Sequence, residues 1–282
     1  MIEVGLVGKP NAGKSSFFKA ATMVEVEISN RPFTTIDANV GIAYVSFDCV
    51  CKELGIKCNP QDGFCMNGIR FAPIKLIDVA GLVPEAHKGK GLGNKFLDDV
   101  RKAEALIHVV DFSGKTDEFG NPTENHNPLD DITFLEREIE LWFKSIIEKN
   151  LGKLMKFKDR DELIDFLLQK LSGLEIERVH LERALEKTDI DNTEEFAHWL
   201  RIFSKPIVIA ANKMDLPEAQ ENFDRLKDRL KDRTVIPTSA DAEIALKLAA
   251  KMKLIEYIPG RTFKIIDEMN EQQRKALNKI SD

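Results

Sequence analysis

The 282-residue sequence has no long apolar run, no surplus of positive charge and few cysteines. No stretch approaches the roughly 18 to 20 apolar residues of a transmembrane helix, and the N-terminus lacks a signal-peptide pattern, so we expect a cytoplasmic protein without a membrane partner. A formal net charge of −6 argues against a chain that coats DNA or RNA by bulk electrostatics, although it permits a local basic face. An apolar content of 43% is typical of a globular chain with one large domain or two smaller ones.

All four cysteines, Cys49, Cys51, Cys58 and Cys65, lie in one short stretch. Such clustering suggests a metal site, but the spacing C-x-C-x₆-C-x₆-C matches none of the common zinc-finger or zinc-ribbon patterns. The rest of the chain shows no sign of an oxidising compartment. We therefore favour reduced thiols in a surface hairpin, with a structural zinc ion and a disulfide as the alternatives.

Residues 8–15 read Gly-Lys-Pro-Asn-Ala-Gly-Lys-Ser and have the form of a phosphate-binding P-loop. An apolar run over residues 2–7 predicts a strand before the loop, and a helix is expected over residues 14–23. Glycines allow successive N–H groups to turn toward a phosphate chain, and the helix adds the positive end of its dipole. In this motif Lys14 reaches the β- and γ-phosphates and Ser15 ligates Mg²⁺. The alternative is a glycine-rich turn without a ligand.

Residues 29–36 form an irregular polar stretch that suits a nucleotide-dependent switch loop. In such loops a threonine hydroxyl meets Mg²⁺ and a backbone N–H meets the γ-phosphate. Thr34 and Thr35 are both candidates, and the spacing does not choose between them. An ordinary surface loop is the alternative.

A second candidate switch follows a strand predicted over residues 71–79. The strand ends in the D-x-x-G sequence Asp78-Val79-Ala80-Gly81, in which the Asp78 carboxylate could hold a Mg²⁺-bound water and the Gly81 N–H could meet the γ-phosphate. Leu82 stands where Ras-type GTPases carry the glutamine that orients the attacking water. His87 could replace that glutamine, although a solvated loop histidine is the simpler interpretation.

The most specific motif after the P-loop is Asn212-Lys213-Met214-Asp215, which follows a buried-strand pattern over residues 205–211. Asp215 can accept hydrogen bonds from the N1–H and N2–H₂ groups of guanine. Adenine presents no such pair of donors and would leave the carboxylate unpaired, which costs several kcal/mol. The motif therefore predicts GTP and GDP as ligands.

Other residues of this region are expected to complete the base site. Asn212 would bond the other edge of the base and tie its loop to the P-loop, and the Lys213 stem would cover the base plane. Ser239 and Ala240 end a last strand predicted over residues 234–240 and would support guanine O6 with a main-chain N–H.

An inserted helical pair or bundle is expected over residues 130–204. Thr133 and Glu136 fit a capping box, which predicts that an amphipathic helix starts there. Its charge is divided, because residues 142–160 carry six Lys/Arg against two Asp/Glu and residues 161–195 carry four against eleven. Solvated helix faces are the simplest interpretation, and a basic face that contacts RNA or the ribosome is the alternative.

These motifs, in this order, resemble the Obg-like GTPases of the YchF type, most closely the archaeal form. Pro32-Phe33-Thr34-Thr35 and the glycine-rich stretch from residue 81 to residue 97 carry the resemblance, which spans nearly the whole chain. It implies an α/β fold with a Ras-like, mostly parallel sheet flanked by helices and a coiled-coil-like helical insertion. Residues 1–129 and 205–253 would form the G domain, 130–204 the insertion and 254–282 an extension toward a TGS domain that this chain lacks.

The resemblance also implies a function, a slow nucleotide switch associated with ribosomes that hydrolyses GTP to GDP and phosphate. Lys14, Thr35 and Gly81 would be the catalytic positions, and Ser15, Thr35 and Asp78 the Mg²⁺ ligands. Some relatives hold K⁺ through the P-loop asparagine, here Asn11. The expected nucleotide contacts are Gly8, Asn11, Ala12, Gly13, Lys14, Ser15, Ser16, Asn212, Lys213, Asp215, Ser239 and Ala240.

Two alternative functions remain open, as does the oligomeric state. Many bacterial and eukaryotic members end the Asn-Lys-x-Asp motif in Glu and prefer ATP, whereas this chain retains Asp215. The other alternative is a scaffold that binds RNA or the ribosome through the insertion, with incidental hydrolysis.

Overall fold

A computed structural model of the chain describes residues 1–23, 39–79, 92–267 and 269–281. The first predicted switch (residues 29–36) and residues 80–91 of the second fall outside the described residues, whereas Asp78 ends a strand and the glycine-rich stretch is helical from Leu92 onward. The predictions for Thr34, Thr35, Gly81, Leu82 and His87 therefore have no structural counterpart here.

The described residues form a seven-stranded sheet with the strand order β2-β4-β1-β5-β6-β7, and β3 pairs with β4. The strands β4, β1, β5, β6 and β7 run parallel, whereas β2 and β3 are antiparallel to β4. This is the mostly parallel α/β sheet that the sequence predicts. The bounds are Glu3–Val7 for β1, Val40–Asp48 for β2, Phe64–Met66 for β3, Ile69–Asp78 for β4, Ala105–Asp111 for β5, Ile207–Asn212 for β6 and Thr234–Pro237 for β7.

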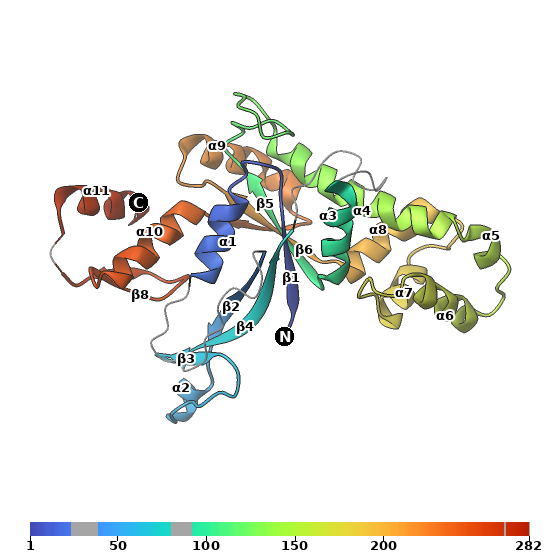
Figure 1. Cartoon of the computed structure of the whole chain (residues 1–282), viewed down its shortest axis with the longest axis horizontal. Helices are drawn as coiled ribbons and strands as arrows, with labels where there is room; N and C mark the ends of the chain where they lie inside the picture. The colour runs from blue at the N-terminus through green and yellow to red at the C-terminus, as the bar shows by residue number, and fades with distance from the viewer. Residues whose placement is uncertain (24–38, 80–91, 268, 282) are drawn as a thin grey trace.

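Helices cover both faces of the sheet, which explains why its central strands are apolar on both sides. On one face α1 (Lys14–Thr22) packs through Phe17 and Phe18 against Leu6 and Val109. The other face contacts α3 (Leu92–Lys102), the start of α4 (Pro128–Glu148) and α9 (Pro217–Leu226), and the short η2 (Lys227–Leu230) follows α9. On the α1 side lies α10 (Ala240–Lys251), as Figure 1 shows.

A group of helices extends from one end of the sheet, and α4 is its longest member (Figure 1). Next along the chain are α5 (Leu151–Leu154), α6 (Arg160–Lys170), α7 (Arg178–Leu185) and α8 (Thr193–Ser204), and α8 packs along α4. One hydrophobic core runs from Val100 of α3 through Trp142 of α4 to Leu181 of α7. The inserted helices therefore share a core with the sheet-bearing part of the chain.

The predicted capping box at Thr133 is wrong, because α4 begins five residues earlier, at Pro128. Proline suits the first helical position, where its missing N–H costs nothing. The Thr133 hydroxyl instead donates within the helix to the Leu129 carbonyl oxygen, 3.1 Å away. Glu136 does not reach back to the helix start, and its carboxylate accepts two hydrogen bonds from Arg233 at 3.0 and 2.8 Å.

Beyond α10 the chain forms the hairpin of β8 (Ile255–Tyr257) and β9 (Phe263–Ile265), followed by α11 (Glu271–Ser281). Leu246 of α10, Ile255 and Leu277 build a small separate core there. Asn270 caps α11, since its side chain accepts the Gln273 N–H at 2.9 Å. Among the described residues, no helix combines the length and the apolar character that a membrane span requires.

Candidate functional site

The predicted site residues that the structure describes gather at the carboxyl edge of the parallel strands. The P-loop follows β1, Asp78 ends β4, Asp111 ends β5 and Asn212 ends β6. In open α/β sheets this edge is where ligands bind, because loops from neighbouring strands meet there.

Two P-loop glycines lie where a side chain would not fit. Gly13 caps α1 with a φ of +93°, and a Cβ there would lie 2.3 Å from Nδ2 of Asn212. A Cβ on Gly8 would lie 2.6 Å from the Val109 carbonyl oxygen. The backbone of the P-loop therefore packs closely against β5 and against Asn212. Ala12, between the two glycines, is fully buried.

Lys14 forms an ion pair with Asp78, so the structure joins the predicted phosphate lysine to the predicted Mg²⁺ carboxylate. The ammonium group also donates to the Val79 carbonyl oxygen at 2.7 Å. Both side chains are partly shielded from water, so each charge stabilises the other. A phosphate and a cation entering this site would compete for the two members of the pair.

The oxygen donors here fit a magnesium ion. Ser15 is the second residue of α1, and its exposed position leaves the hydroxyl accessible. A hydroxyl and a carboxylate are hard oxygen ligands of the kind that Mg²⁺ binds together with water and phosphate oxygens. Ser16, the next residue of α1, is half-buried.

Asn212 ties the base motif to the P-loop. Its side chain is buried, with 2% exposure. It donates from Nδ2 to the Ala12 carbonyl oxygen at 3.0 Å and accepts the Ala240 N–H on Oδ1 at 3.1 Å. The Ala240 N–H is therefore already engaged, so its predicted contact with guanine O6 would require this hydrogen bond to be shared.

Asp215 presents its carboxylate at the surface. Oδ1 accepts the Ser239 hydroxyl at 2.7 Å, and that same oxygen of Ser239 caps α10 by accepting the Ala242 N–H at 3.2 Å. This hydrogen bond fixes the orientation of the Asp215 carboxylate and leaves Oδ2 available to accept hydrogen bonds from a ligand. Ser239 would thus position the carboxylate for the predicted guanine contact.

Lys213 lies in the left-handed region, with a φ of +68°, and its Nζ is 2.8 Å from Oδ2 of Asp111. Burial alone would raise the pKa of Asp111, but hydrogen bonds from Lys213, Ser113 and Thr116 outweigh it and hold that pKa below its ordinary value. The aliphatic part of the Lys213 side chain, which is predicted to cover the guanine base, is therefore held at one end by the backbone and at the other by the ion pair with Asp111. Asp111 was not among the predicted site residues, although its place after an apolar strand resembles that of Asp78.

A buried ionic group links the P-loop to α4, and sequence reasoning missed it. Nζ of Lys9 lies 2.9 Å from Asp131 Oδ2 and donates to the Thr116 carbonyl oxygen at 2.6 Å. Asp131 also contacts Nε2 of His126 at 2.8 Å. Burial raises the pKa of Asp131, against the lowering effect of Lys9 and His126. Nothing in the local sequence distinguishes Lys9 from an ordinary solvated lysine.

Asn11 also adopts a left-handed conformation, with a φ of +62°. Its Nδ2 donates to the Gly120 carbonyl oxygen at 2.9 Å. This contact orients the amide and leaves Oδ1 as the atom that can ligate a cation. A Cβ on Gly120 would lie 2.7 Å from the Pro10 carbonyl oxygen, so the loop after β5 packs closely on the P-loop.

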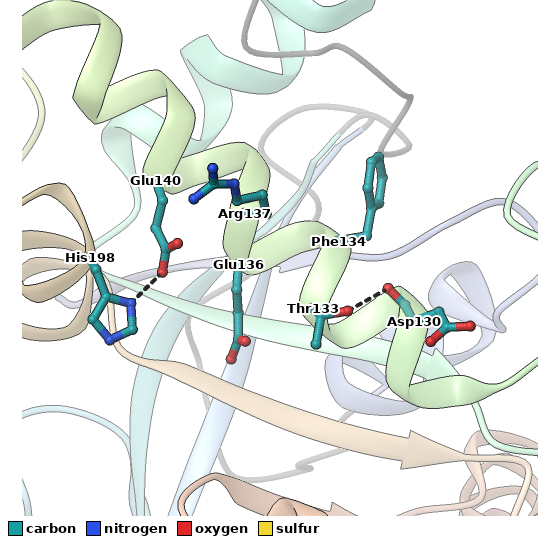
Figure 2. Close-up of a pocket in the computed structure, with 7 residues that line it drawn as sticks. All are labelled: Asp130, Thr133, Phe134, Glu136, Arg137, Glu140 and His198. Carbon is teal, nitrogen blue, oxygen red and sulfur yellow. Dashed lines mark hydrogen bonds and ion pairs between the residues drawn. The ribbon is translucent and has the colours of Figure 1, made fainter. Parts of the chain in front are cut away.

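A concave surface also lies along α4 (Figure 2). Two of its acidic groups are already paired, since Glu140 lies 2.7 Å from His198 Nδ1 and Glu136 binds Arg233, and Asp130 accepts a hydrogen bond from Asn127. We assign this surface no ligand. It is lined by Asp130, Thr133, Phe134, Glu136, Arg137, Glu140 and His198.

Comparisons with known proteins agree with this arrangement. The family described as 50S ribosome-binding GTPase matches residues 3–149, which is more than half of the chain. The Obg-like GTPase YGR210-like, G4 motif-containing domain matches residues 210–282, which include Asn212 and Asp215.

Individual relatives point the same way. An uncharacterized GTP-binding protein of Methanocaldococcus jannaschii is 51% identical over 292 residues, which cover 100% of this chain and 74% of that protein. The ribosome-binding ATPase YchF of Bacillus subtilis is 34% identical over 238 residues, 80% of this chain and 62% of that one. The crystal structure of a GTP-binding protein from Pyrococcus horikoshii matches with a TM-score of 0.73 and 38% identity over 98% of this chain and 73% of that one. The chain therefore belongs to the Obg-like family of P-loop GTPases.

Proposed function

We propose that this chain binds GTP and GDP and hydrolyses GTP as a slow nucleotide switch. The observation that carries the proposal is the convergence of Lys14 and Asp78 with Asn212 and Asp215 at one edge of the sheet. Lys14 and the P-loop N–H groups would neutralise charge on the β- and γ-phosphates, where it develops during in-line attack by water. Leu82 offers no side chain that could orient that water, which supports a slow reaction.

Mg²⁺, held by Ser15, Asp78 and one of the two switch threonines with Thr35 preferred, would supply further neutralisation of the phosphate charge. For Asp78 to reach the ion, its contact with Lys14 must open. The nucleotide can drive this exchange, because its phosphates offer Lys14 a new anionic partner.

Selectivity for guanine is the most direct test of the proposal. Asp215 favours guanine over adenine, although the relative from B. subtilis is named an ATPase. The competition of GDP and ADP for the purified chain, each against a fluorescent nucleotide, measures this choice. We expect GDP to bind more tightly, and a preference for ADP of about tenfold, or 1.4 kcal/mol, would contradict the assignment of Asp215.

A potassium ion at Asn11 is a second proposal about the same site. Oδ1 is the free end of that amide, because Nδ2 is bound to Gly120. We expect GTP turnover to fall several-fold when Na⁺ replaces K⁺, while GDP affinity changes little. Equal turnover in both salts would remove this role from Asn11.

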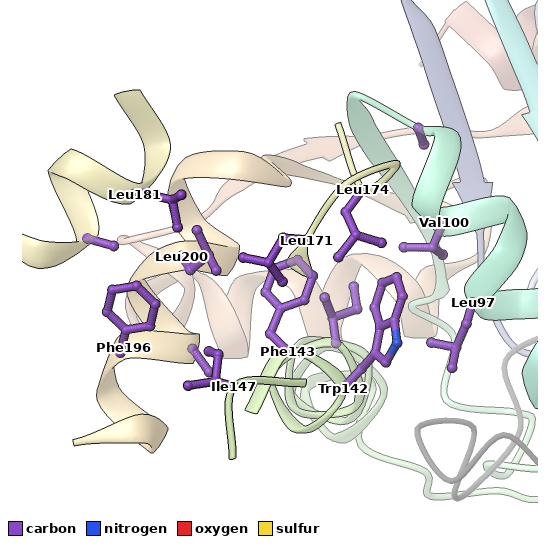
Figure 3. Packing of buried hydrophobic residues seen from close by; sticks show 14 of the residues in the cluster. Leu97, Val100, Trp142, Phe143, Ile147, Leu171, Leu174, Leu181, Phe196 and Leu200 are labelled. Atoms are coloured by element: carbon purple, nitrogen blue, oxygen red, sulfur yellow. The ribbon is translucent and has the colours of Figure 1, made fainter. Parts of the chain in front are cut away.

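The inserted helices are placed to sense the nucleotide. The second predicted switch leads directly into α3, and Leu97 and Val100 of α3 pack near Trp142 and Leu174 of the insertion, as Figure 3 shows. Because close-packed cores transmit displacement rather than absorb it, a shift of α3 on hydrolysis would move the insertion. A partner bound to the insertion could thereby read the bound nucleotide.

We propose the ribosome as that partner, at a basic surface on the insertion. The name of the B. subtilis relative supports it, and so does a group of exposed lysines near α5, the part of the insertion farthest from the sheet (Figure 1). None of these lysines forms an ion pair with any residue that the structure describes. They are Lys149, Lys153, Lys156 and Lys158.

Replacement of these four lysines by glutamine tests the surface. We expect weaker co-sedimentation with ribosomes and a smaller salt dependence of binding, because each lost phosphate contact lowers the salt slope by about 0.7 to 0.9. The matched control replaces four exposed lysines elsewhere, Lys227, Lys231, Lys253 and Lys264. If the two variants bind ribosomes equally well, the lysines near α5 do not contact the ribosome and the insertion has only a structural role.

A further inference from the structure

The four cysteine thiols meet in space although they come from four different local structures. Cys49 follows β2, Cys51 begins α2 (Cys51–Leu54), Cys58 lies on the next loop and Cys65 lies within β3. The Sγ atoms of Cys49 and Cys58 are 3.7 Å apart, those of Cys51 and Cys65 are 3.6 Å apart, and all four lie within 4.8 Å of one another. Over the described residues, no other group of three or more such side chains is arranged to hold a metal ion.

These separations match a tetrahedral thiolate site. Four sulfurs at about 2.3 Å from a central zinc ion lie about 3.8 Å from one another. The separations of 3.7 Å and 3.6 Å are close to this value, and a contraction of up to about 1 Å would bring any wider pair to it. A disulfide requires sulfurs about 2.05 Å apart, and all four cysteines are free thiols in this structure. A site with sulfur alone excludes Mg²⁺ and Ca²⁺, which bind oxygen.

Backbone contacts hold the thiols in place. The Cys49 N–H donates to the Gly68 carbonyl oxygen at 2.8 Å, which closes the base of the hairpin. The Ile56 N–H donates to the Cys51 carbonyl oxygen at 3.1 Å and turns the chain back toward the cluster. Because the ligands come from a strand end, a helix start, a loop and a strand, their spacing differs from that of zinc ribbons, in which pairs of ligands share one turn.

The segment that carries the cluster has almost no core of its own. We call residues 49–68 the cysteine lobe. Cys51 is the one buried residue of this lobe, all of which the structure describes. Three of its large apolar side chains face water, with Val50 64%, Leu54 66% and Ile56 59% exposed, whereas Phe64 stacks on Phe71 of β4. Outside the pairing of β3 with β4, the lobe therefore buries little apolar surface of its own, and a bound metal ion would supply a cross-link that this packing lacks.

We propose that Cys49, Cys51, Cys58 and Cys65 bind one Zn²⁺ ion as thiolates and that this ion holds the cysteine lobe together. Each thiol releases its proton on binding, and the ion is neither oxidised nor reduced. The lobe lies at the start of β4, whereas Asp78 ends that strand of ten residues. At about 3.3 Å per residue the cluster is roughly 30 Å from Asp78, so the ion is structural and separate from the nucleotide site.

Zinc content of the full chain, purified without oxygen and dialysed against Zn²⁺, tests the proposal. We expect about one zinc per chain by mass spectrometry of the metal, and near zero in Cys58→Ser, because a site that loses a thiolate binds far more weakly. The matched control is Asn59→Ser on the same exposed loop, which should keep its zinc. GDP affinity should be unchanged in both variants, and this confirms that they fold.

Cobalt provides an independent measurement on the unaltered chain. Co²⁺ in place of Zn²⁺ should give the strong visible absorption and sulfur-to-metal charge transfer of a tetrahedral thiolate site. Three outcomes would overturn the proposal. They are a zinc-free chain with four reactive thiols, a Cys58→Ser chain with full zinc content, or iron or a disulfide at the cluster in the anaerobic protein.

Discussion

Replacement of Asp215 by asparagine should separate guanine recognition from phosphate binding. In the structure Asp215 is exposed and contacts Ser239 through Oδ1. Among the described residues, no hydrogen bond joins its carboxylate to the P-loop. The substitution keeps the shape of the side chain and removes its charge. It also exchanges one acceptor oxygen for an NH₂ group, which would face the NH₂ donor of guanine.

The expected loss follows from the hydrogen bonds involved. Bonds to a charged group contribute about 1.5 to 3 kcal/mol each, and a neutral bond about 1 kcal/mol. Guanine would lose two charge-assisted bonds to Asp215 and regain one neutral bond. Because the carboxylate is exposed, we take the lower part of the range, about 2 to 3 kcal/mol, which weakens GDP binding roughly 30- to 150-fold. Xanthine carries an oxygen where guanine has its NH₂ group, so XDP should gain affinity for the variant.

Titration with fluorescent GDP and XDP measures both effects, and Asp224→Asn on the exposed face of α9 is the matched control. The free energy of unfolding of Asp215→Asn should stay within about 0.5 kcal/mol of the parent, as for other surface substitutions. A loss of GDP affinity below about threefold, or roughly 0.7 kcal/mol, would refute the role of Asp215. A variant with no gain for XDP would refute the proposed pairing geometry.

Three further predictions concern the P-loop and β5. Gly13→Ala places a Cβ 2.3 Å from Asn212 at a φ of +93°, so backbone strain and the lost hydrogen bond should lower the unfolding free energy by about 2 to 3 kcal/mol; urea unfolding that stays unchanged would contradict this. Asp78→Asn releases Lys14 and removes the proposed Mg²⁺ ligand, so GDP affinity in a chelator should hold or rise while GTP turnover falls about tenfold or more; a parallel fall of both would be inconsistent with the ion pair. His108 is buried, and burial together with Lys9 lowers its pKa from 6.5 to about 3. The folded state therefore binds fewer protons there, and the unfolding free energy should fall by up to about 1.4 kcal/mol per pH unit below about pH 6.5, a slope that His108→Leu should lack in urea unfolding between pH 7 and pH 5.

Much of the fold, and the place of the candidate nucleotide site at the edge of the sheet, could be predicted from the sequence because the signals are local. The apolar runs of β5 and β6 are typical of strands buried on both faces, and the motifs stand at their carboxyl ends. The start of α4 was predicted wrongly, because a Thr-x-x-Glu pattern also occurs inside helices whose side chains have other partners. Pro128 was the better signal, and it lies next to the end of a long loop.

Contacts between distant segments could not be predicted in the same way. The ion pairs of Lys9 with Asp131 and of Lys14 with Asp78 depend on how β1, β4 and α4 pack together. The distances between these residues along the sequence do not predict that packing. The shared core of α3 and the insertion has the same origin. The apolar stripe of each helix predicts which face of that helix is buried, but it does not predict which other element that face packs against.

The sequence by itself determined which nucleotide chemistry this chain is built for, because glycine, lysine and carboxylate positions act through local backbone geometry and hydrogen-bonding type. It left the four cysteines ambiguous, since their spacing matches no common metal pattern. Only the tertiary structure decided that their sulfurs meet, because the pairing of β3 with β4 brings Cys65 back beside Cys49, Cys51 and Cys58. The four thiols come from separate local structures, so only the path of the folded backbone brings them together.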